Sequence, residues 1–135
     1  MSLQLDYMKQ ALADVQDVRG NHDEKIWKPY GALCHQIPVF VLTNGLALTA
    51  AFVDAKAGAS QPFTLVRGHM IHALGGGANT LTGVLDRTNR ADDQYMLDTF
   101  TILDAWVYYK RFAVSILDVE PGTVDDALES QAGDV

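Results

Sequence analysis

Apolar residues recur at helical spacing near the start of the chain. They stand three or four positions apart, with charged residues between them, at Leu5, Met8, Leu12 and Val15. This spacing puts all four on one side of a helix and predicts an amphipathic helix over residues 3–19. Gly20 follows at the point where a helix commonly ends.

Two further helical segments are bounded by proline and glycine. The first begins near Glu24, and we expect it to close before Pro38, because a proline has no amide hydrogen to give to a helix interior. The second begins at Ser60, with Pro62 in its first turn, and ends at the glycines 75–77. Both segments are shorter than the helix expected near the carboxyl end.

Residues 38–57 allow two interpretations. Asn44-Gly45 between two apolar runs is typical of a two-residue β-hairpin turn. The run that follows is rich in helix-forming residues and lacks strict alternation, and Pro38 stands where the first turn of a helix accepts a proline. We favour one buried helix, with the hairpin as the alternative.

The clearest helix is expected from about Asp92 to Asp118, after a looser segment at 78–91. It would hold about 26 residues and measure about 39 Å at 1.5 Å per residue. Its apolar face is wide. One apolar line is formed by Met96, Phe100, Leu103, Val107, Val114 and Leu117, and a second lies beside it at Ile102, Trp106, Tyr109, Ala113 and Ile116.

These elements predict an all-α fold, a single-domain bundle of about five to six helices with a long C-terminal helix. A chain of 135 residues suits one core. We place the bundle at residues 1–117 and an acidic, flexible tail at 118–135. The chain carries a net charge of −7, but the tail holds six acidic residues and no Lys or Arg, which leaves 10 basic and 11 acidic residues in the bundle.

Composition favours a cytoplasmic protein. The only cysteine, Cys34, has no partner for an internal disulfide and is expected to be a small core residue. The amino terminus lacks the pattern of a signal peptide. The apolar stretch 37–53 is shorter than the roughly 20 residues that span a bilayer, so no membrane is expected among the partners.

The residues that could carry chemistry do not form a recognisable catalytic pattern. His69 and His72 could share a helix face and reach one metal, but no HExxH motif surrounds them. Cys34 and His35 are neighbours on a helix and point in different directions. We therefore expect no enzyme activity, no cofactor and no metal, and keep a small metalloprotein or hydrolase built on His69 and His72 as the alternative.

A more specific pattern runs through the chain: Tyr30-Gly31, Pro38, Asn44-Gly45-Leu46, Ala51-Phe52, Ala105-Trp106 and the run from Lys110 to Ala113. It resembles the Cmr-five family, the small helical subunit of the type III-B (Cmr) CRISPR RNA-guided effector complex, over roughly residues 5–117. The resemblance implies a structural role for Tyr30, Gly31, Pro38, Asn44, Gly45, Leu46, Phe52 and Trp106. It also implies that Asn44-Gly45 is a close-packing point inside a helix.

The resemblance further implies a non-catalytic subunit of antiviral defence whose copies stack beside the guide-RNA-bearing backbone. The implied partners are the backbone RAMP subunits, the large subunit, neighbouring copies of the chain, the guide RNA and the target RNA. A groove that holds paired RNA needs cations against phosphates without reading bases. By this analogy, the candidates for RNA-backbone contact are Lys28, Lys56, Arg67, Lys110 and Arg111. From the residues alone, the basic positions beside aromatic residues favour an ordinary solvated surface over an RNA contact.

Overall fold

The computed structural model describes residues 3–75, 79–86 and 92–122, and over these residues the chain forms helices and no strand. This confirms the all-α fold with a long C-terminal helix. In chain order the helices are α1 (Leu3–Asn21), α2 (Glu24–Asn44), α3 (Leu46–Ala57), α4 (Gln61–Leu74), α5 (Leu81–Leu85) and α6 (Asp92–Ser115).

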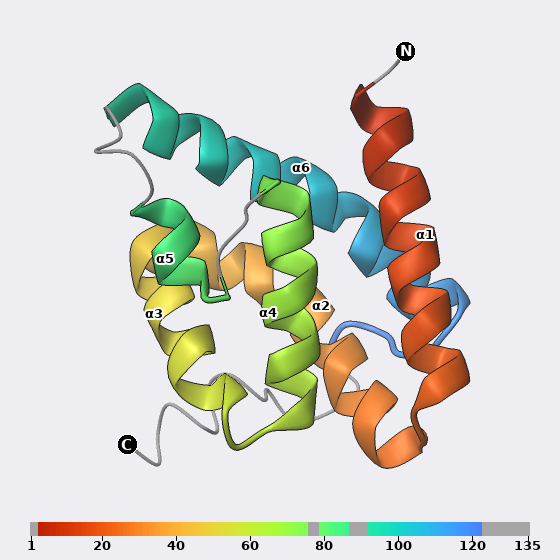
Figure 1. Cartoon of the computed structure of the whole chain (residues 1–135). Helices are drawn as coiled ribbons and strands as arrows, with labels where there is room; N and C mark the ends of the chain where they lie inside the picture. The colour runs from red at the N-terminus through yellow and green to blue at the C-terminus, as the bar shows by residue number, and fades with distance from the viewer. Residues whose placement is uncertain (1–2, 76–78, 87–91, 123–135) are drawn as a thin grey trace.

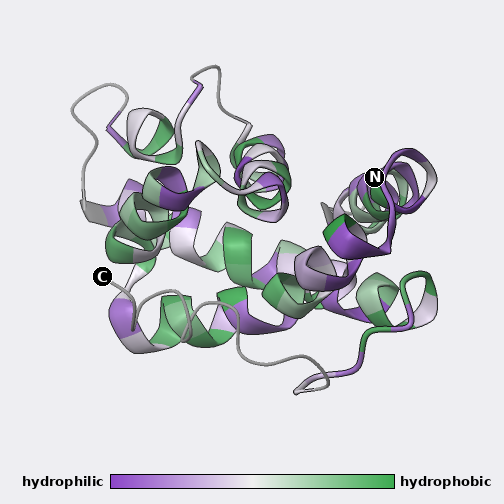
Figure 2. Ribbon diagram, turned by 90° about the horizontal axis from the view of Figure 1, so that it is seen from below, coloured by the Kyte–Doolittle hydropathy of each residue, from purple (hydrophilic) through white to green (hydrophobic). Residues whose placement is uncertain are grey.

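The helices pack around one core. α4 stands between α3 and α1, and α6 crosses behind α4 and α1 (Figure 1). α2 contacts α3, α4 and α6. Every helix contributes side chains to a single hydrophobic cluster, and the mixture of hydrophobic and hydrophilic residues along each helix is visible in Figure 2. The molecule is therefore one helical bundle.

α2 is longer than its prolines suggested. It continues through Pro29 and Pro38 to Asn44, so the expectation that this helix closes before Pro38 is wrong. Each proline removes one hydrogen bond from the helix interior, at a cost of about 3 kcal/mol in an isolated helix. Burial outweighs that cost here, because one side of α2 is fully enclosed at Leu33, Ile37 and Val41.

The segment 38–57 is helical, as favoured, but it is not one helix. Gly45 has φ 87° and ψ 157°, which ends α2 and starts α3. The expectation of a close-packing point inside a helix is therefore wrong at Asn44-Gly45. A positive φ costs glycine little and other residues more, so glycine fits a sharp break between two helices. The Ala47 amide in the first turn of α3 donates to the Tyr95 hydroxyl of α6 at 2.9 Å.

The apolar face of α6 is only partly buried. The line at Ile102, Trp106, Tyr109 and Ala113 enters the core, and Asp98 is buried beside it. In the other apolar line, Met96, Phe100 and Val107 are about half exposed, whereas Leu117 is buried. The apolar face of α6 is wider than the area that the neighbouring helices cover.

α5 lies within the segment 78–91 that was expected to be looser. Asp54 of α3 anchors it, because its carboxylate accepts hydrogen bonds from the Leu81 and Thr82 amides and from the Thr82 hydroxyl, each at 2.9 Å. The Thr80 hydroxyl accepts from the Gly83 amide at 3.0 Å as an N-cap. These bonds satisfy the first amides of a helix too short to be stable alone.

The packed bundle extends beyond residue 117. Val119 is fully buried, and its carbonyl accepts a 2.7 Å hydrogen bond from His35 Nε2 of α2. A Cβ added to Gly31 would lie 2.8 Å from Val119 Cγ2. The absence of a side chain at Gly31 thus lets the chain after α6 close onto α2. Residues 123–135 of the acidic segment lie outside the described residues.

A buried polar cluster joins four helices. Asp14 of α1 is 7 % exposed, and its carboxylate accepts a hydrogen bond from the Tyr109 hydroxyl of α6. His69 of α4 holds Nε2 3.9 Å from Asp14 Oδ1 and Nδ1 2.7 Å from the Tyr30 hydroxyl of α2. Because Nε2 faces a carboxylate, we assign the imidazole proton to Nε2, and Nδ1 then accepts from Tyr30.

Two more side chains complete the surroundings of Asp14. Gln10 Nε2 donates to Oδ1 at 3.2 Å, and His72 Nδ1 lies 3.5 Å from Oδ2. The Tyr109 ring stacks on Trp106, with the ring centroids 4.2 Å apart. The carboxylate is therefore surrounded by donors and rings from three helices, as a buried charge requires.

Burial decides the protonation of this cluster. Desolvation lowers the pKa of His69 to about 4, because the loss of water penalises the imidazolium more than the nearby Asp14 carboxylate stabilises it. Burial also raises the pKa of Tyr30 and of Tyr109, and the charge of Asp14 raises that of Tyr109 further. His69 and both phenols are therefore neutral near pH 7.

We predict that Gly31→Ala destabilises the fold by about 1–3 kcal/mol, because its Cβ would collide with Val119. The matched control is Gly68→Ala in α4, where an added Cβ meets no atom within 4 Å and should gain up to about 1 kcal/mol of helix propensity. Urea unfolding measures both. Equal effects from the two substitutions would contradict the packing argument, whereas Val119→Ala should partly rescue Gly31→Ala.

We also predict a loss of stability on mild acidification. In the unfolded chain His69 has a pKa near 6.5, so the unfolded state takes up this proton first as the pH falls. The contribution of His69 to the free energy of unfolding is complete above about pH 6.5 and lost toward pH 4. Between pH 7 and pH 5 the loss should be about 2 kcal/mol.

The matched control for the acid effect is His69→Gln, which keeps an acceptor but does not titrate. Urea unfolding of both proteins at pH 7, 6 and 5 isolates the histidine, because the same carboxylates remain in each. The free energy of unfolding should fall less steeply in the variant. The same pH dependence in both proteins would show that His69 is not the group responsible.

Candidate nucleic-acid interface

The five basic residues proposed for RNA contact lie on four helices. Lys28 is on α2, Lys56 on α3, Arg67 on α4, and Lys110 and Arg111 on α6. Arg111 is exposed, and the other four are partly exposed. Lys110 and Arg111 are consecutive residues of α6, and the other three occupy separate helices.

These cations differ in the acidic residues that surround them in the sequence. Lys28 forms an ion pair with Glu24 one turn earlier, at 3.2 Å. By contrast, the chain contains no Asp or Glu in residues 55–85, which include Lys56 and Arg67, or in residues 105–117, which include Lys110 and Arg111. These two stretches carry positive charge that no acidic residue within them offsets.

The aromatic residues beside the cations differ in their availability. Tyr109 is buried in the core and cannot stack on a base, whereas Tyr108 is partly exposed. Trp27 lies under the guanidinium of Arg19, whose Cζ is 4.8 Å from the ring centroid. Arg19 belongs to α1, and no local pattern in the sequence marks it as a neighbour of Trp27. Lys56 lies above the ring of Phe52 at 5.6 Å.

The residues of the family pattern lie mostly inside the bundle. Tyr30, Gly31, Leu46 and Trp106 are buried, and Tyr30 and Gly31 make the contacts with His69 and Val119 described above. Phe52 is partly buried between two other rings, Phe40 at 5.5 Å and Phe63 at 5.9 Å. Pro38 and Asn44 belong to the second half of α2, and Gly45 forms the break after it.

His69 and His72 lie close together, and both already face other side chains of the protein. Their ring centroids are 6.0 Å apart, and both face Asp14. Each nitrogen of His69 faces a protein group, Tyr30 at Nδ1 and Asp14 at Nε2. In the described part of the chain, no three or more His, Cys, Asp or Glu side chains are grouped so as to hold a metal ion. The geometry does not favour the metalloprotein alternative.

Cys34 is equally unsuited to chemistry at neutral pH. Its side chain is fully buried beside the Tyr30 hydroxyl, and burial raises the pKa of the thiol to about 12. A thiolate is the reactive form of cysteine, so this thiol is not a ready nucleophile. The expectation of a small core residue is confirmed.

Among the described helices, none combines the length and apolar character needed to cross a membrane.

Comparison with known proteins supports the resemblance. The family model described as CRISPR-associated protein (Cas_Cmr5) matches residues 3–116. No curated protein and no solved structure matches the chain. The match covers α1 to α6 in full. The chain belongs to the Cas_Cmr5 family of CRISPR-associated proteins.

Proposed function

We propose that this protein is a non-catalytic small subunit of a type III-B (Cmr) CRISPR ribonucleoprotein in the cytoplasm. Copies of it stack along the complex, beside the backbone RAMP subunits and the large subunit. Their basic side chains contact the sugar-phosphate backbone of the guide and target RNA in antiviral defence. Membership of the Cas_Cmr5 family supports the place in the complex.

The distribution of charge supports RNA contact. Lys56, Arg67, Lys110 and Arg111 stand in the two stretches without acidic residues, although the whole chain carries a net charge of −7. Lysine and arginine bind phosphates by displacing condensed counterions, and this contact does not depend on base sequence. Of the five candidates, Lys28 is the weakest, because Glu24 already neutralises it in part.

The burial of the most reactive side chains supports a non-catalytic role. Cys34 and His69 are the residues most able to act as nucleophile or base. Both are buried and contact the Tyr30 hydroxyl. The low pKa of His69 leaves it a weak base at neutral pH. The cluster around Asp14 holds helices together and gives a substrate little access.

We predict that replacing Lys110 and Arg111 with glutamine weakens RNA binding by the reconstituted complex. The slope of log K against log salt concentration should become shallower by roughly one unit for each lost phosphate contact. Fluorescence anisotropy with labelled target RNA at several salt concentrations measures this slope. Arg67→Gln should act in the same direction, and Lys28→Gln should act less.

The matched control is Lys9→Gln, which removes an exposed cation from the acidic surface of α1. It should leave the salt dependence unchanged. If the Lys110 and Arg111 variant enters the complex fully and keeps the wild-type slope, these residues do not contact RNA. If the wild-type chain does not assemble with other Cmr subunits, the proposal of a structural subunit fails as a whole.

A further inference from the structure

The described chain ends beside the basic end of α6. After α6 the backbone turns back, with the Asp118 amide donating to the Val114 carbonyl at 3.1 Å and the Val119 amide to the Ala113 carbonyl at 3.0 Å. Asp118 makes this turn with φ 57°, the left-handed conformation that closes many helices. Val119 is therefore held against the last turns of α6, and Lys110 is three residues before Ala113 in the same helix.

The packing of Val119 fixes the point from which the rest of the chain continues. Its side chain is fully buried over Gly31, and its carbonyl accepts a hydrogen bond from His35 Nε2 at 2.7 Å. Residues 123–135 follow outside the described residues. Thirteen residues span up to about 43–47 Å when extended, which is several times the diameter of a helix. The segment 123–135 is therefore long enough to reach any exposed side chain near the end of α6.

The segment 123–135 carries only negative charge on its side chains. Its ionisable residues are Asp125, Asp126, Glu129 and Asp134, and it contains no Lys, Arg or His. Carboxylates spaced along a chain attract the same cations as the phosphates of an RNA strand. The segment is therefore suited to compete with RNA for a basic surface.

Lys110 and Arg111 are the last two cations of the chain. Arg111 is exposed and Lys110 is partly exposed, and among the described residues neither forms an ion pair with an acidic side chain. Lys28 of α2 is three residues before Gly31, but it already pairs with Glu24 at 3.2 Å. The two cations of α6 are therefore better placed than Lys28 to attract the acidic segment.

Covalent attachment strengthens an attraction that would otherwise be weak. A single exposed ion pair contributes little to binding, because water and salt screen it. A tether of this length holds the carboxylates near α6 at an effective concentration in roughly the millimolar range. RNA at a much lower concentration must displace them before it reaches the same cations.

We propose that the acidic segment 123–135 docks on Lys110 and Arg111 in the free subunit and shields them from RNA. Paired RNA in the assembled complex then displaces the segment. The docking requires only opposite charges, whereas its effect on RNA binding rests on the proposed function.

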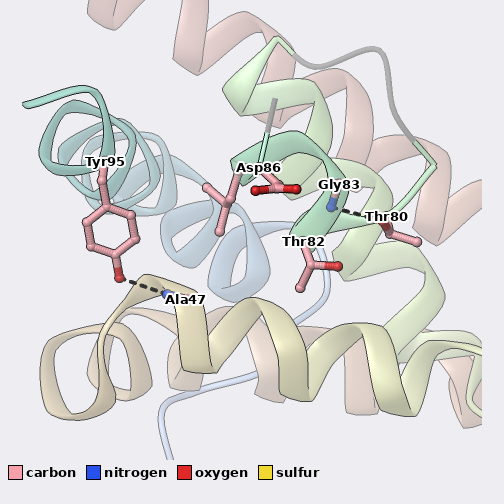
Figure 3. Close-up of a pocket in the computed structure, with 7 residues that line it drawn as sticks. Ala47, Thr80, Thr82, Gly83, Asp86 and Tyr95 are labelled. Atoms are coloured by element: carbon pink, nitrogen blue, oxygen red, sulfur yellow. Dashed lines mark hydrogen bonds between the residues drawn. The ribbon is translucent and has the colours of Figure 1, made fainter. Parts of the chain in front are cut away.

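A rival site for the acidic segment lies elsewhere in the chain. The open pocket where α3, α5 and α6 meet is lined by the carboxylate of Asp86, and its described lining holds no Lys or Arg (Figure 3). Arg87 and Arg90 follow Asp86 in the sequence, outside the described residues. The test must therefore tell the end of α6 from these two arginines.

The direct test is paramagnetic relaxation by NMR in the full-length chain with a nitroxide attached at Ser130→Cys. Cys34 is fully buried with a pKa of about 12, so it should not take the label. At low salt the label should weaken the amide signals of Tyr108, Arg111 and Ser115 by about half or more, and roughly 0.5 M salt should restore them by screening the charges.

The control for this measurement is a neutralised variant, in which the four acidic residues of the segment become Asn or Gln and the label stays in place. The tether is unchanged, so most of the relaxation at α6 should disappear only if attraction holds the segment there. Equal relaxation in the two proteins would overturn the proposal. So would relaxation at low salt that is centred on Arg87 and Arg90.

A second measurement is the binding of single-stranded RNA of mixed sequence to the free, unlabelled subunit at low salt. The neutralised variant should bind about threefold to tenfold more tightly than the wild-type chain, because the tethered competitor is gone. The reference variant removes four exposed carboxylates outside the segment, by Asn substitutions at Asp6, Asp17, Asp23 and Asp93. It should gain less than about twofold through total charge alone. Equal gains would contradict docking.

A last variant identifies the cations. Lys110→Gln combined with Arg111→Gln in the neutralised variant should abolish the gain in RNA affinity, and persistence of the gain would overturn the proposed docking site. If the neutralised variant binds no RNA while the wild-type segment still relaxes the α6 amides, the RNA contact of the proposed function fails and the docking stands. Failure of this proposal and failure of the proposed function are therefore distinguishable.

Discussion

A carboxylate inside the bundle sets the arrangement of the larger helices. Asp14 is almost fully buried, and a buried charge is tolerated only where donors surround it. Its partners come from its own helix and from two others: Gln10, His69, His72 and Tyr109. Through His69, Tyr30 brings in α2 as well. One set of polar contacts therefore links α1, α2, α4 and α6, and the loss of a single partner would leave the carboxylate with fewer compensating contacts.

The polar residues of the interior contact one another across helices. The side chains best suited to catalysis are enclosed and hydrogen-bonded, while four of the candidate cations lie in stretches free of acidic residues. Elsewhere, Asp86, Tyr95 and residues of the first turns of α3 and α5 line an open pocket.

Several features of the fold and interface could not be inferred from local sequence. Pro38 predicts a helix boundary, yet the burial of α2 lets the helix continue past it. Asn44-Gly45 suits either a hairpin turn or a packed helix, and the structure uses it as a break between two helices. Arg19 reaches Trp27 from a different helix. In each case the outcome depends on neighbours distant in the chain.

The sequence by itself determined the helical class, the approximate position of most helices, the buried state of Cys34 and the family. Helical periodicity is local, and the family pattern is carried by residue identity, so neither needs a neighbour in space. Only the tertiary structure decided how far each apolar line of α6 is buried and how the chain after α6 closes against Gly31. The physical reason is that burial and charge compensation are properties of contacts between helices, and those contacts exist only after the chain has folded.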